Sequence, residues 1–426
     1  MNIIVFRHPA LENYLPKENL DQITIITPAK FEETYKIFYS EYSIKPKIYF
    51  LEDWRLPAMI TVLNEINLTY KIEKISTLAE EDIEEVALLR EFYTKQSSQL
   101  LTDLLFRDKY YMRSFLQNIV RQPKFRLIEK NEDIELFKKQ SSSDEFILKR
   151  RNLAGGSHVK KVHRNSEITP EITFLDLYSG DYLIEEFVDL PQMVTADGYA
   201  VSGNISRFFS HEYNEHLLES FEHEYLLLRT SHLYHSKNDY INKIKKQSQK
   251  VLNIFLRNKD NISPFHFEWF INEETEEVVF NEVGRRFGGG NIPQLIQIAF
   301  GIDILNEYWL HENSIDNSNC TVIPKNIPDQ IAASFMPYKK HGKIIELPSN
   351  DLFDWTVKTR MLSKIGDTNT QDVEIVTDIP FMSSFSASDE TDLNIKIKRL
   401  IQLSNKIKYA KLDGDKDNMI NDTVTN

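Results

Sequence analysis

The chain has 426 residues, 41% of them hydrophobic and 27% charged, a composition that indicates a folded globular protein and argues against disorder as its main state. Its 51 Lys and Arg residues against 64 Asp and Glu residues give a net charge of −13, which disfavours nucleic acid or an anionic membrane as a partner. The single cysteine, Cys320, excludes an internal disulfide and a cysteine-based zinc site. We expect a cytoplasmic protein, because the N-terminal apolar run is short and no run is long enough to cross a membrane.

The first part of the chain alternates between short β-type runs and helical spacing. Strands are predicted at residues 3–6, 23–27 and 47–51, and helices at residues 30–42 and 57–67. This alternation is typical of a parallel sheet with crossover helices. A long helix is then predicted over about residues 80–105 and an amphipathic helix over residues 108–119.

The rest of the chain divides by its apolar content. A small α/β unit with strands at 122–128, 146–150 and 157–162 and a helix at 132–140 has few apolar residues, which suggests a flap packed on one side. Longer apolar runs follow, and then a smaller region with strands at 331–338 and 343–347 and a closing helix at 392–407. The predicted parts are residues 1–107, 108–182, 183–315 and 316–410, with a polar tail at 411–426.

Glycine use is uneven. The chain has 13 glycines, where average usage of about 7% would give roughly 30, and the first is Gly155. Five lie in two clusters, Gly155–Gly156 and Gly288–Gly290. Either cluster alone could be a surface turn, but both are expected where the backbone must approach a ligand closely.

The segment from Phe265 to Ile302 carries the strongest local signal. Two apolar runs flank a polar stretch, which predicts a hairpin, and a turn centred on Thr275 places Glu268 directly across from Glu282. Opposed carboxylates repel unless a cation lies between them, and Mg²⁺ is the expected cation. The alternative is a solvated acidic face.

Groups that bind anions follow immediately. Arg285 and Arg286 precede the second glycine cluster, and Asn291 and Pro293 predict the start of a helix whose N–H groups face the glycine loop. A helix N-terminus beside a guanidinium group binds anions. Together with the paired glutamates, this combination predicts phosphoryl transfer to a carboxylate.

These motifs resemble those of ATP-grasp enzymes, in which an acidic residue on one strand is followed by an E-x-x-x-R run and glycines on the next. Three further segments resemble ATP-grasp motifs in the expected order: DKYYMR, FILKRRNLAGGSHVKKV and YLIEEFVDLPQ. The resemblance implies an α/β ATP-grasp fold with an N-terminal Rossmann-like pre-ATP-grasp domain, a lid subdomain and a C-terminal subdomain.

The resemblance also implies the contacts with ATP. Lys109 or Arg113 would contact phosphate, and Lys149 would contact the α-phosphate or the adenine side. The remaining implied contacts are the lid residues Gly155, Gly156 and Ser157 over the phosphates, Glu185, Glu186 and Val188 at the base edge, and Gln192 at the ribose, where many members have glutamate.

For catalysis, the resemblance implies an ATP-dependent carboxylate-amine ligase that forms an amide through an acyl phosphate, in the branch that joins amino acids. Two Mg²⁺ ions, with Mn²⁺ as a substitute, would bind Glu268 and Glu282, and Gly284 stands where a third ligand is often Asn. The implied catalytic residues are Arg286, Arg285 and Lys149, and the implied substrate-binding residues are His266, Arg286, Gly289, Gly290 and Asn291.

Other interpretations remain open at this point. The acyl group could pass to a carrier protein or a thiol, or the chain could be a nucleotide-binding scaffold without activity. A homodimer is an expectation from the family alone. The run from His211 to His216, which contains three ionisable residue types in mixed spacing, is predicted to be a loop or helix surface.

Overall fold

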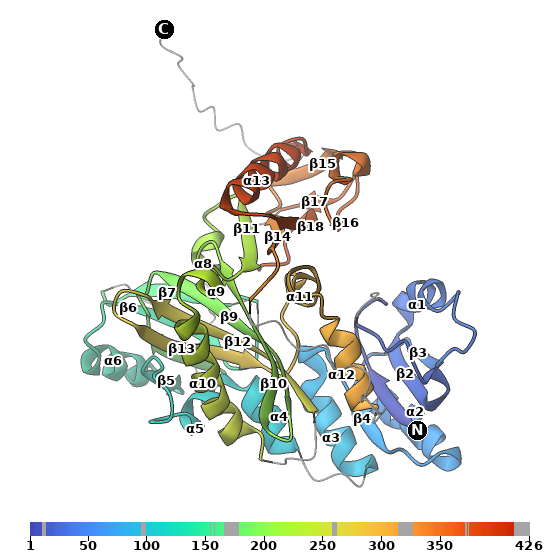
Figure 1. The fold of residues 1–426 in the computed structure, drawn as a ribbon. Coiled ribbons are helices and arrows are strands. Elements are labelled where there is room, and N and C mark those ends of the chain that lie inside the picture. The colour runs from blue at the N-terminus through green and yellow to red at the C-terminus, as the bar shows by residue number, and fades with distance from the viewer. Residues whose placement is uncertain are drawn as a thin grey trace.

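The computed structural model describes residues 1–10, 14–94, 99–153, 155–156, 158–165, 179–257, 262–313, 327–370, 373 and 375–412. Within these ranges the chain forms four β-sheets with helices packed around them (Figure 1). The predicted lid residue Ser157, Cys320 and nearly all of the predicted tail lie outside the described residues.

The N-terminal sheet is parallel, in the order β3-β2-β1-β4, as the alternation predicted. Its helices supply the crossovers, and Ile3, Val5 and Ile26 pack against Leu63 and Ile66 of α2 in one core. The elements are β1 (Asn2–Val5), β2 (Ile23–Pro28), α1 (Glu32–Phe38), β3 (Lys47–Leu51), α2 (Leu56–Thr69) and β4 (Lys74–Ser76).

The long helix predicted over residues 80–105 is wrong. A helix α3 (Ile83–Tyr93) ends at Thr94, whose backbone is extended, and a separate helix α4 (Leu100–Arg107) follows. The Thr94 hydroxyl donates to the Arg90 carbonyl at 2.8 Å, which satisfies an acceptor of the last helical turn. The helical spacing of apolar residues therefore continues past Thr94, where the helix ends, and this is why the sequence predicted one long helix.

The predicted flap, called the lid sheet below, is a four-stranded antiparallel sheet in the order β5-β8-β6-β7, entered through helix α5 (Lys109–Phe115). Helix α6 packs against this sheet, and their core is the small cluster around Phe137, Phe146 and Tyr182. The elements are β5 (Phe125–Ile128), α6 (Asn131–Gln140), β6 (Glu145–Arg150), β7 (Lys160–His163) and β8 (Tyr182–Glu186).

The largest sheet has eight strands in the order β13-β12-β9-β10-β11-β14-β18-β16, with antiparallel neighbours throughout. Strands from before and after the undescribed residues 314–326 pair within it, because β11 pairs with β14. The strands are β9 (Gln192–Val201), β10 (Asn204–Tyr213), β11 (Tyr225–Thr230), β12 (Ile262–Asn272), β13 (Glu277–Gly284), β14 (Ile331–Pro337), β16 (Lys358–Met361) and β18 (Phe381–Ala387).

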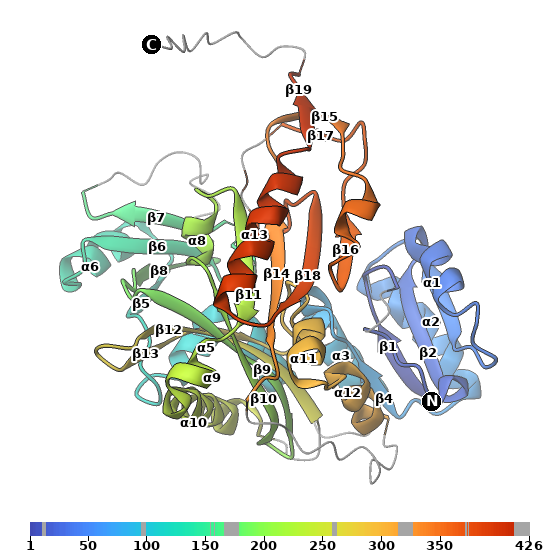
Figure 2. The same ribbon diagram turned by 45° about the horizontal axis from the view of Figure 1, so that its top comes forward.

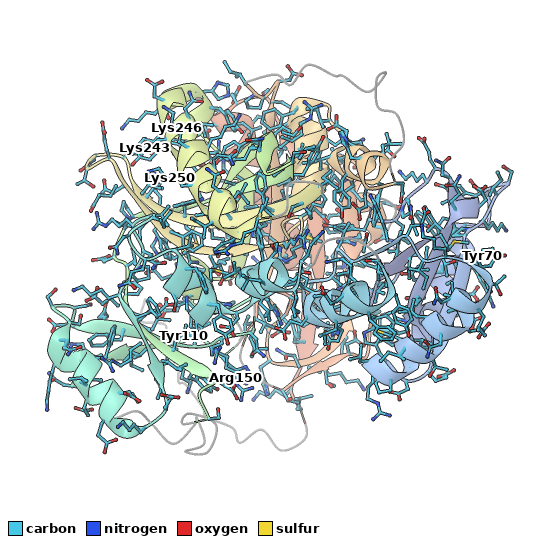
Figure 3. All side chains as sticks on the ribbon, turned by 90° about the horizontal axis from the view of Figure 1, so that it is seen from below. Tyr70, Tyr110, Arg150, Lys243, Lys246 and Lys250 are labelled. Atoms are coloured by element: carbon cyan, nitrogen blue, oxygen red, sulfur yellow. The ribbon has the colours of Figure 1, made fainter. Side chains whose placement is uncertain are left out.

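Helices and a small sheet complete the fold (Figure 2). Lys243, Lys246 and Lys250 lie along the outside of α10 (Asn238–Phe255) (Figure 3). No helix in the described ranges is both long and apolar enough to span a membrane. The other elements are α8 (Leu217–Ser220), α9 (Leu233–Ser236), α11 (Ile292–Phe300), α12 (Ile304–Glu312), α13 (Glu390–Ser404) and the sheet of β15 (Gly342–Glu346), β17 (Thr368–Asn369) and β19 (Lys408–Ala410).

Candidate active site

A cavity of about 960 Å³ lies where the N-terminal sheet, the lid sheet and the eight-stranded sheet meet. Its lining includes Phe6 from the N-terminal region, Lys149 from the lid sheet, and Glu282 and Arg360 from the two outermost strands of the eight-stranded sheet. The eight-stranded sheet therefore curves around the cavity, since its opposite edges reach the same space.

The predicted pair of glutamates is confirmed by the strand register. Glu268 on β12 pairs directly with Glu282 on β13, and both line the cavity. The two side chains have different partners. Glu268 accepts hydrogen bonds from Tyr213 Oη at 3.3 Å and Asn281 Nδ2 at 3.0 Å, whereas Glu282 lies 3.3 Å from Lys109 Nζ.

The electrostatic surroundings keep Glu282 ionised. Burial alone would raise the pKa of its carboxyl group, but the ammonium groups of Lys109 and Lys149 outweigh burial and lower the pKa to about 2. Two neighbouring carboxylates are hard oxygen ligands of the kind that Mg²⁺ prefers. In the described part of the chain no cluster of three or more His, Cys, Asp or Glu side chains could hold a metal ion. The pair fits an ion that takes its remaining ligands from phosphate and water.

Lys149 belongs to a buried ion cluster. Its Nζ lies 2.8 Å from Glu185 Oε2, and Arg113 Nε donates to Glu185 Oε1 at 2.9 Å. Burial raises the pKa of Glu185, yet Arg113 and Lys149 together lower it to about 2. Burial also lowers the pKa of Lys149, against the opposing effect of Glu185. Lys149 and Glu185 line the cavity, and their contacts with a nucleotide stay a prediction.

Arg113 is placed differently from the prediction. Its side chain is 1% exposed and lies behind Glu185, outside the described lining of the cavity. The predicted phosphate contact of Arg113 is therefore corrected, because its guanidinium group is used to hold Glu185. Lys109 remains the candidate for a phosphate contact, since its Nζ faces Glu282 and also donates to the carbonyl of Leu153 at the start of the glycine loop.

The predicted lid and base-edge residues that the structure describes line the cavity, whereas Gln192, the predicted ribose contact, does not. Gly155 and Gly156 have φ angles of 68° and 79°, a conformation that favours glycine, and the Gly155 carbonyl accepts from Val376 N at 3.4 Å. Glu186 and Val188 also line the cavity. Gln192 begins strand β9 outside the described lining and hydrogen-bonds to Glu273, so its predicted ribose contact is corrected.

Arg286 connects the eight-stranded sheet with the N-terminal region. Its Nε donates to Glu80, and Arg107 Nη1 donates to the same carboxylate at 3.3 Å. Although burial raises the pKa of Glu80, the two guanidinium groups lower it overall. Glu80 lines the cavity beside Arg286, and no sequence pattern had marked it, because it precedes a helix in a separate part of the chain.

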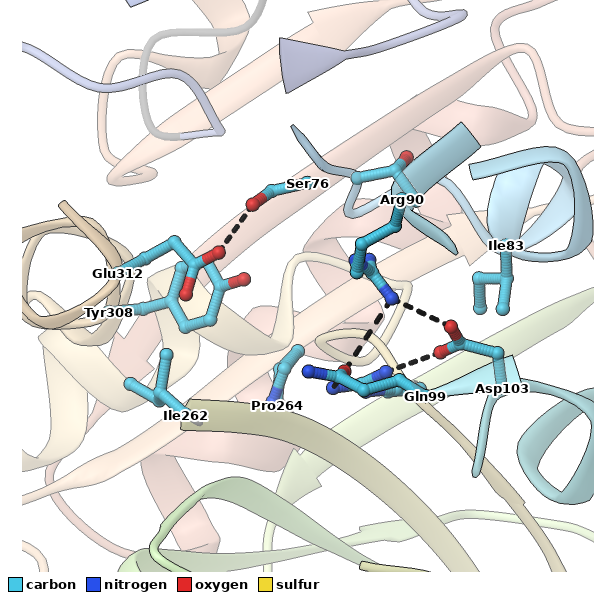
Figure 4. A pocket seen from close by; sticks show the side chains of 11 residues that line it. Ser76, Ile83, Arg90, Gln99, Asp103, Ile262, Pro264, Tyr308 and Glu312 are labelled. Atoms are coloured by element: carbon cyan, nitrogen blue, oxygen red, sulfur yellow. Dashed lines mark hydrogen bonds and ion pairs between the residues drawn. The ribbon is translucent and has the colours of Figure 1, made fainter. Parts of the chain in front are cut away.

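Arg285 points away from the cavity, which corrects its predicted catalytic role. Figure 4 shows the small pocket that it lines between α3, α4 and β12. Its Nη2 donates to Gln99 Oε1 at 2.6 Å, its Nε donates to Ser263 Oγ at 3.1 Å, and Asp103 is its ion-pair partner. Strand β13 ends at Gly284 and the chain bends at Arg285 and Arg286, where the two neighbouring side chains take different partners.

His266 lines the cavity beside Glu268 and belongs to a buried network. Its Nδ1 is 2.7 Å from Asp197 Oδ1, and His211 Nδ1 is 3.1 Å from Asp197 Oδ2. Burial alone would lower the pKa of His266, but Asp197 raises it to about 9. A Cβ atom on Gly288 would come within 2.7 Å of both His266 Nδ1 and Asp197 Oδ1, so glycine is needed for the close approach of this loop.

This network overturns the prediction for the run from His211 to His216. His211 is fully buried on β10, and Tyr213, at the end of the same strand, contacts Glu268. The run alternates between the two faces of a sheet, whereas its polar composition had suggested a surface. The contact between His211 and Asp197 joins positions 14 residues apart on paired strands, which no short motif records.

The second glycine cluster leads into helix α11, as predicted. Asn291 precedes the helix with a φ angle of 63°, but its side chain does not cap the helix. Its Nδ2 donates to Ser384 Oγ at 3.0 Å, and its Oδ1 accepts from Arg360 Nη2 at 3.0 Å. Gly289, Gly290 and Asn291 line the cavity together with Arg360, which sequence reasoning missed.

The chain has the ATP-grasp fold, because solved structures of ATP-grasp ligases match nearly all of it. An L-amino acid ligase from Bacillus licheniformis matches with a TM-score of 0.70 over 97% of this chain and 99% of that one, at 14% identity. A phosphoribosylglycinamide synthetase from Anaerococcus prevotii matches with a TM-score of 0.64 over 96% and 99% of the two chains, at 14% identity.

A third similar structure contains bound ligands. It is an N5-carboxyaminoimidazole synthase from Aspergillus clavatus in complex with ADP and 5-aminoimidazole ribonucleotide, with a TM-score of 0.65 over 95% of this chain and 99% of that one, at 10% identity. No family profile matches the sequence, and no curated protein matches it. The similarity therefore establishes the fold, whereas the function has to be inferred from the residues of the site.

Proposed function

We propose that the protein is an ATP-dependent carboxylate-amine ligase that joins amino acids. The observation that carries this proposal is the convergence on one cavity of the paired carboxylates Glu268 and Glu282, the ammonium groups of Lys109 and Lys149, and the guanidinium group of Arg286. The three similar structures are those of an amino acid ligase, a synthetase and a synthase, which supports the same class of reaction.

In the proposed reaction, an oxygen of the substrate carboxylate attacks the γ-phosphorus of ATP, and the bond from that phosphorus to the ADP oxygen breaks. The amine nitrogen then attacks the acyl phosphate, so that a C–N bond forms while the C–O bond to phosphate breaks and the amine releases a proton. Glu268 and Glu282 would hold Mg²⁺, which neutralises phosphate charge when bound.

The residues of the chain mainly position and neutralise the reactants. Lys149 and Lys109 face the phosphates, Gly155 and Gly156 cover them, and Arg286 orients the substrate carboxylate. Closure of the lid sheet over the cavity would exclude water, which otherwise hydrolyses an acyl phosphate. Glu80 keeps Arg286 in place from the N-terminal side.

The test is release of ADP and phosphate by the purified protein in the presence of Mg²⁺, with the standard amino acids supplied singly and in pairs. We expect release to require a particular pair and mass spectrometry to find a product lighter than the summed substrates by one water. ATP binding without release across all pairs would contradict the amino-acid substrates, and the absence of ATP binding would contradict the proposal as a whole.

A further inference from the structure

The cavity has a second cationic end, which lies across the eight-stranded sheet from the paired glutamates. Arg360 is on β16, the outermost strand on one side, and Glu282 is on β13, the outermost strand on the other. Both residues line the same cavity. The proposed reaction uses Lys109, Lys149 and Arg286 at the glutamate end, so Arg360 has no role in that chemistry.

The loop from Gly288 to Asn291 connects the two ends, and its length limits how far apart they can be. Gly288 lies against His266 and Asp197, whereas Asn291 accepts a hydrogen bond from Arg360 Nη2 at 3.0 Å. Three residues of extended chain span at most about 11 Å. Tyr14 lies close enough to both arginines for each to affect the pKa of its hydroxyl group, which burial raises and the two guanidinium groups lower.

This separation suits one particular kind of acceptor. In an amino acid that attacks through its amine, the carboxyl carbon lies about 4 Å from the new amide carbon, and a guanidinium group that binds the carboxylate lies roughly 4 Å farther on. Arg286 can therefore orient the donor carboxylate while Arg360 binds the carboxylate of the acceptor. A carrier protein's lysine amine or a thiol has no carboxylate in that position.

Apolar side chains form the wall between the two ends. Leu226 and Leu228 lie on one face of β11, Met336 pairs with Leu226 from β14, and Met382 pairs with Arg360 from β18. All four line the cavity, and each is less than 10% exposed. A Cβ atom on Gly290 would come within 3.0 Å of Leu228 Cδ2, so the apolar wall lies directly against the glycine loop.

We propose that Arg360 is a specificity-determining residue that binds the carboxylate of an acceptor amino acid, whose apolar side chain packs on Leu226, Leu228, Met336 and Met382. This inference rests on the proposed function and narrows its acceptor to a free amino acid with an apolar side chain. The recognition combines a charge-assisted hydrogen bond at one end with burial of hydrocarbon along the wall.

The experiment separates donor activation from acceptor binding. First, each standard amino acid is supplied as donor with ATP, Mg²⁺ and hydroxylamine, which traps an acyl phosphate as a hydroxamate without any acceptor. The best donor is then combined with L-leucine or L-leucinamide, and the mixed product is measured by mass spectrometry. Leucinamide retains the amine and the side chain of leucine but lacks the carboxylate.

We expect the unmodified protein to show a KM for leucine at least about tenfold below that for leucinamide. Arg360→Met should raise the KM for leucine at least about tenfold while leaving leucinamide and hydroxamate formation within about twofold. Arg360→Lys, which keeps the charge, should retain most of the preference for leucine. Arg399→Met is the matched control, because Arg399 stacks over Trp355 at 4.6 Å outside the cavity lining described.

The outcomes distinguish the proposed role of Arg360 from the proposed ligase reaction. Equal use of leucine and leucinamide by the unmodified protein, or an equal rise of both KM values in Arg360→Met, would overturn the role of Arg360 and leave the ligase reaction intact. A preference for aspartate or lysine over leucine as acceptor would overturn the proposal that an apolar side chain packs on this wall. Absence of hydroxamate with every donor would instead overturn the proposed function and this inference with it.

Discussion

Lys149 Nζ lies 2.8 Å from Glu185 Oε2, and the same carboxylate is held from its other side by Arg113. One buried carboxylate thus pairs with two buried cations, of which Lys149 alone lines the cavity. The cluster fixes the side chain of Lys149 beside the space where we propose that ATP binds. In this arrangement Lys149 would contact the nucleotide, whereas Arg113 only supports Glu185.

Arg113→Met should therefore lower the stability of the protein. The substitution removes two buried hydrogen bonds to the Glu185 carboxylate, and hydrogen bonds to a charged group contribute about 1.5–3 kcal/mol each, while Lys149 remains as the partner of Glu185. Chemical denaturation measures the change. Arg121→Met is the matched control, since Arg121 pairs with Glu277 at the surface and such a pair contributes only about 0–1 kcal/mol. Equal losses in the two variants would contradict the structural role of Arg113.

Glu282→Gln should abolish ADP formation and leave the fold intact. The substitution removes the charge that we propose holds Mg²⁺, and loss of a charge-stabilising group of this kind lowers kcat by about 100-fold or more. The control is Glu277→Gln on the same strand, which pairs with Arg121 outside the described cavity lining. Turnover of Glu282→Gln close to that of the unmodified protein would refute the metal assignment.

Arg286→Met and Arg285→Met should differ although the two residues are adjacent. Arg286→Met is expected to lower kcat for hydroxamate formation by about 100-fold or more, because Arg286 faces the cavity. Arg285→Met is expected to lower the unfolding free energy instead, because Asp103 and Gln99 would lose a partner between α4 and the loop after β13. Kinetics and thermal unfolding of both variants check these expectations. Loss of activity in Arg285→Met with loss of stability alone in Arg286→Met would contradict the roles given to the two residues.

His232 should give the protein a pH-dependent contribution to stability. Hydrogen bonding to Glu212, with a further contribution from Glu273, raises the pKa of His232 to about 9 in the folded protein. Since the unfolded value is about 6.5, the stabilisation is fully present below pH 6.5 and is lost as the pH rises through 9. The difference in unfolding free energy between the unmodified protein and His232→Gln should therefore shrink from pH 6 to pH 9.5; a constant difference would exclude the linkage.

Gly288→Ala should destabilise the protein more than Gly289→Ala. A Cβ atom at position 288 would lie 2.4 Å from Ile292 Cδ1 and 2.7 Å from Asp197 Oδ1, whereas nothing lies within 4 Å of one at position 289. Overpacking of this kind costs about 1–3 kcal/mol. Thermal unfolding compares the two variants, and an equal effect of both would mean that the loop does not need the close approach at Gly288.

The features that the sequence predicted best are local. Counting residues around a turn centred on Thr275 predicted Glu268 opposite Glu282, and the structure has that pair; nearer the turn the strands pair one residue differently, and a bulge at Asn281 restores the predicted partner. The parallel N-terminal sheet follows from alternating patterns over consecutive segments. In such cases strand period and turn position determine the geometry, and no distant segment has to be placed.

The features that were missed depend on contacts between distant segments. Glu80 contacts Arg286 across 206 residues, and Arg360 contacts Asn291 across 69 residues. The burial of His211 was missed because a polar run can lie on a strand, where an inward-facing histidine contacts a buried carboxylate. Arg285 and Arg286 could not be separated by strand alternation, because they lie in a bend after the end of β13 at Gly284.

The pairing of β11 with β14 determines what removal of the C-terminal part would do. Five residues of each strand are in register there, from Tyr225 opposite Pro337 to Arg229 opposite Ala333. A chain shortened to end before β14 would leave β11 with unpaired backbone groups and exposed leucines along its length. Such an edge is a template for strand addition between molecules. We therefore expect a C-terminally shortened protein to aggregate, and not to persist as a smaller nucleotide-binding unit.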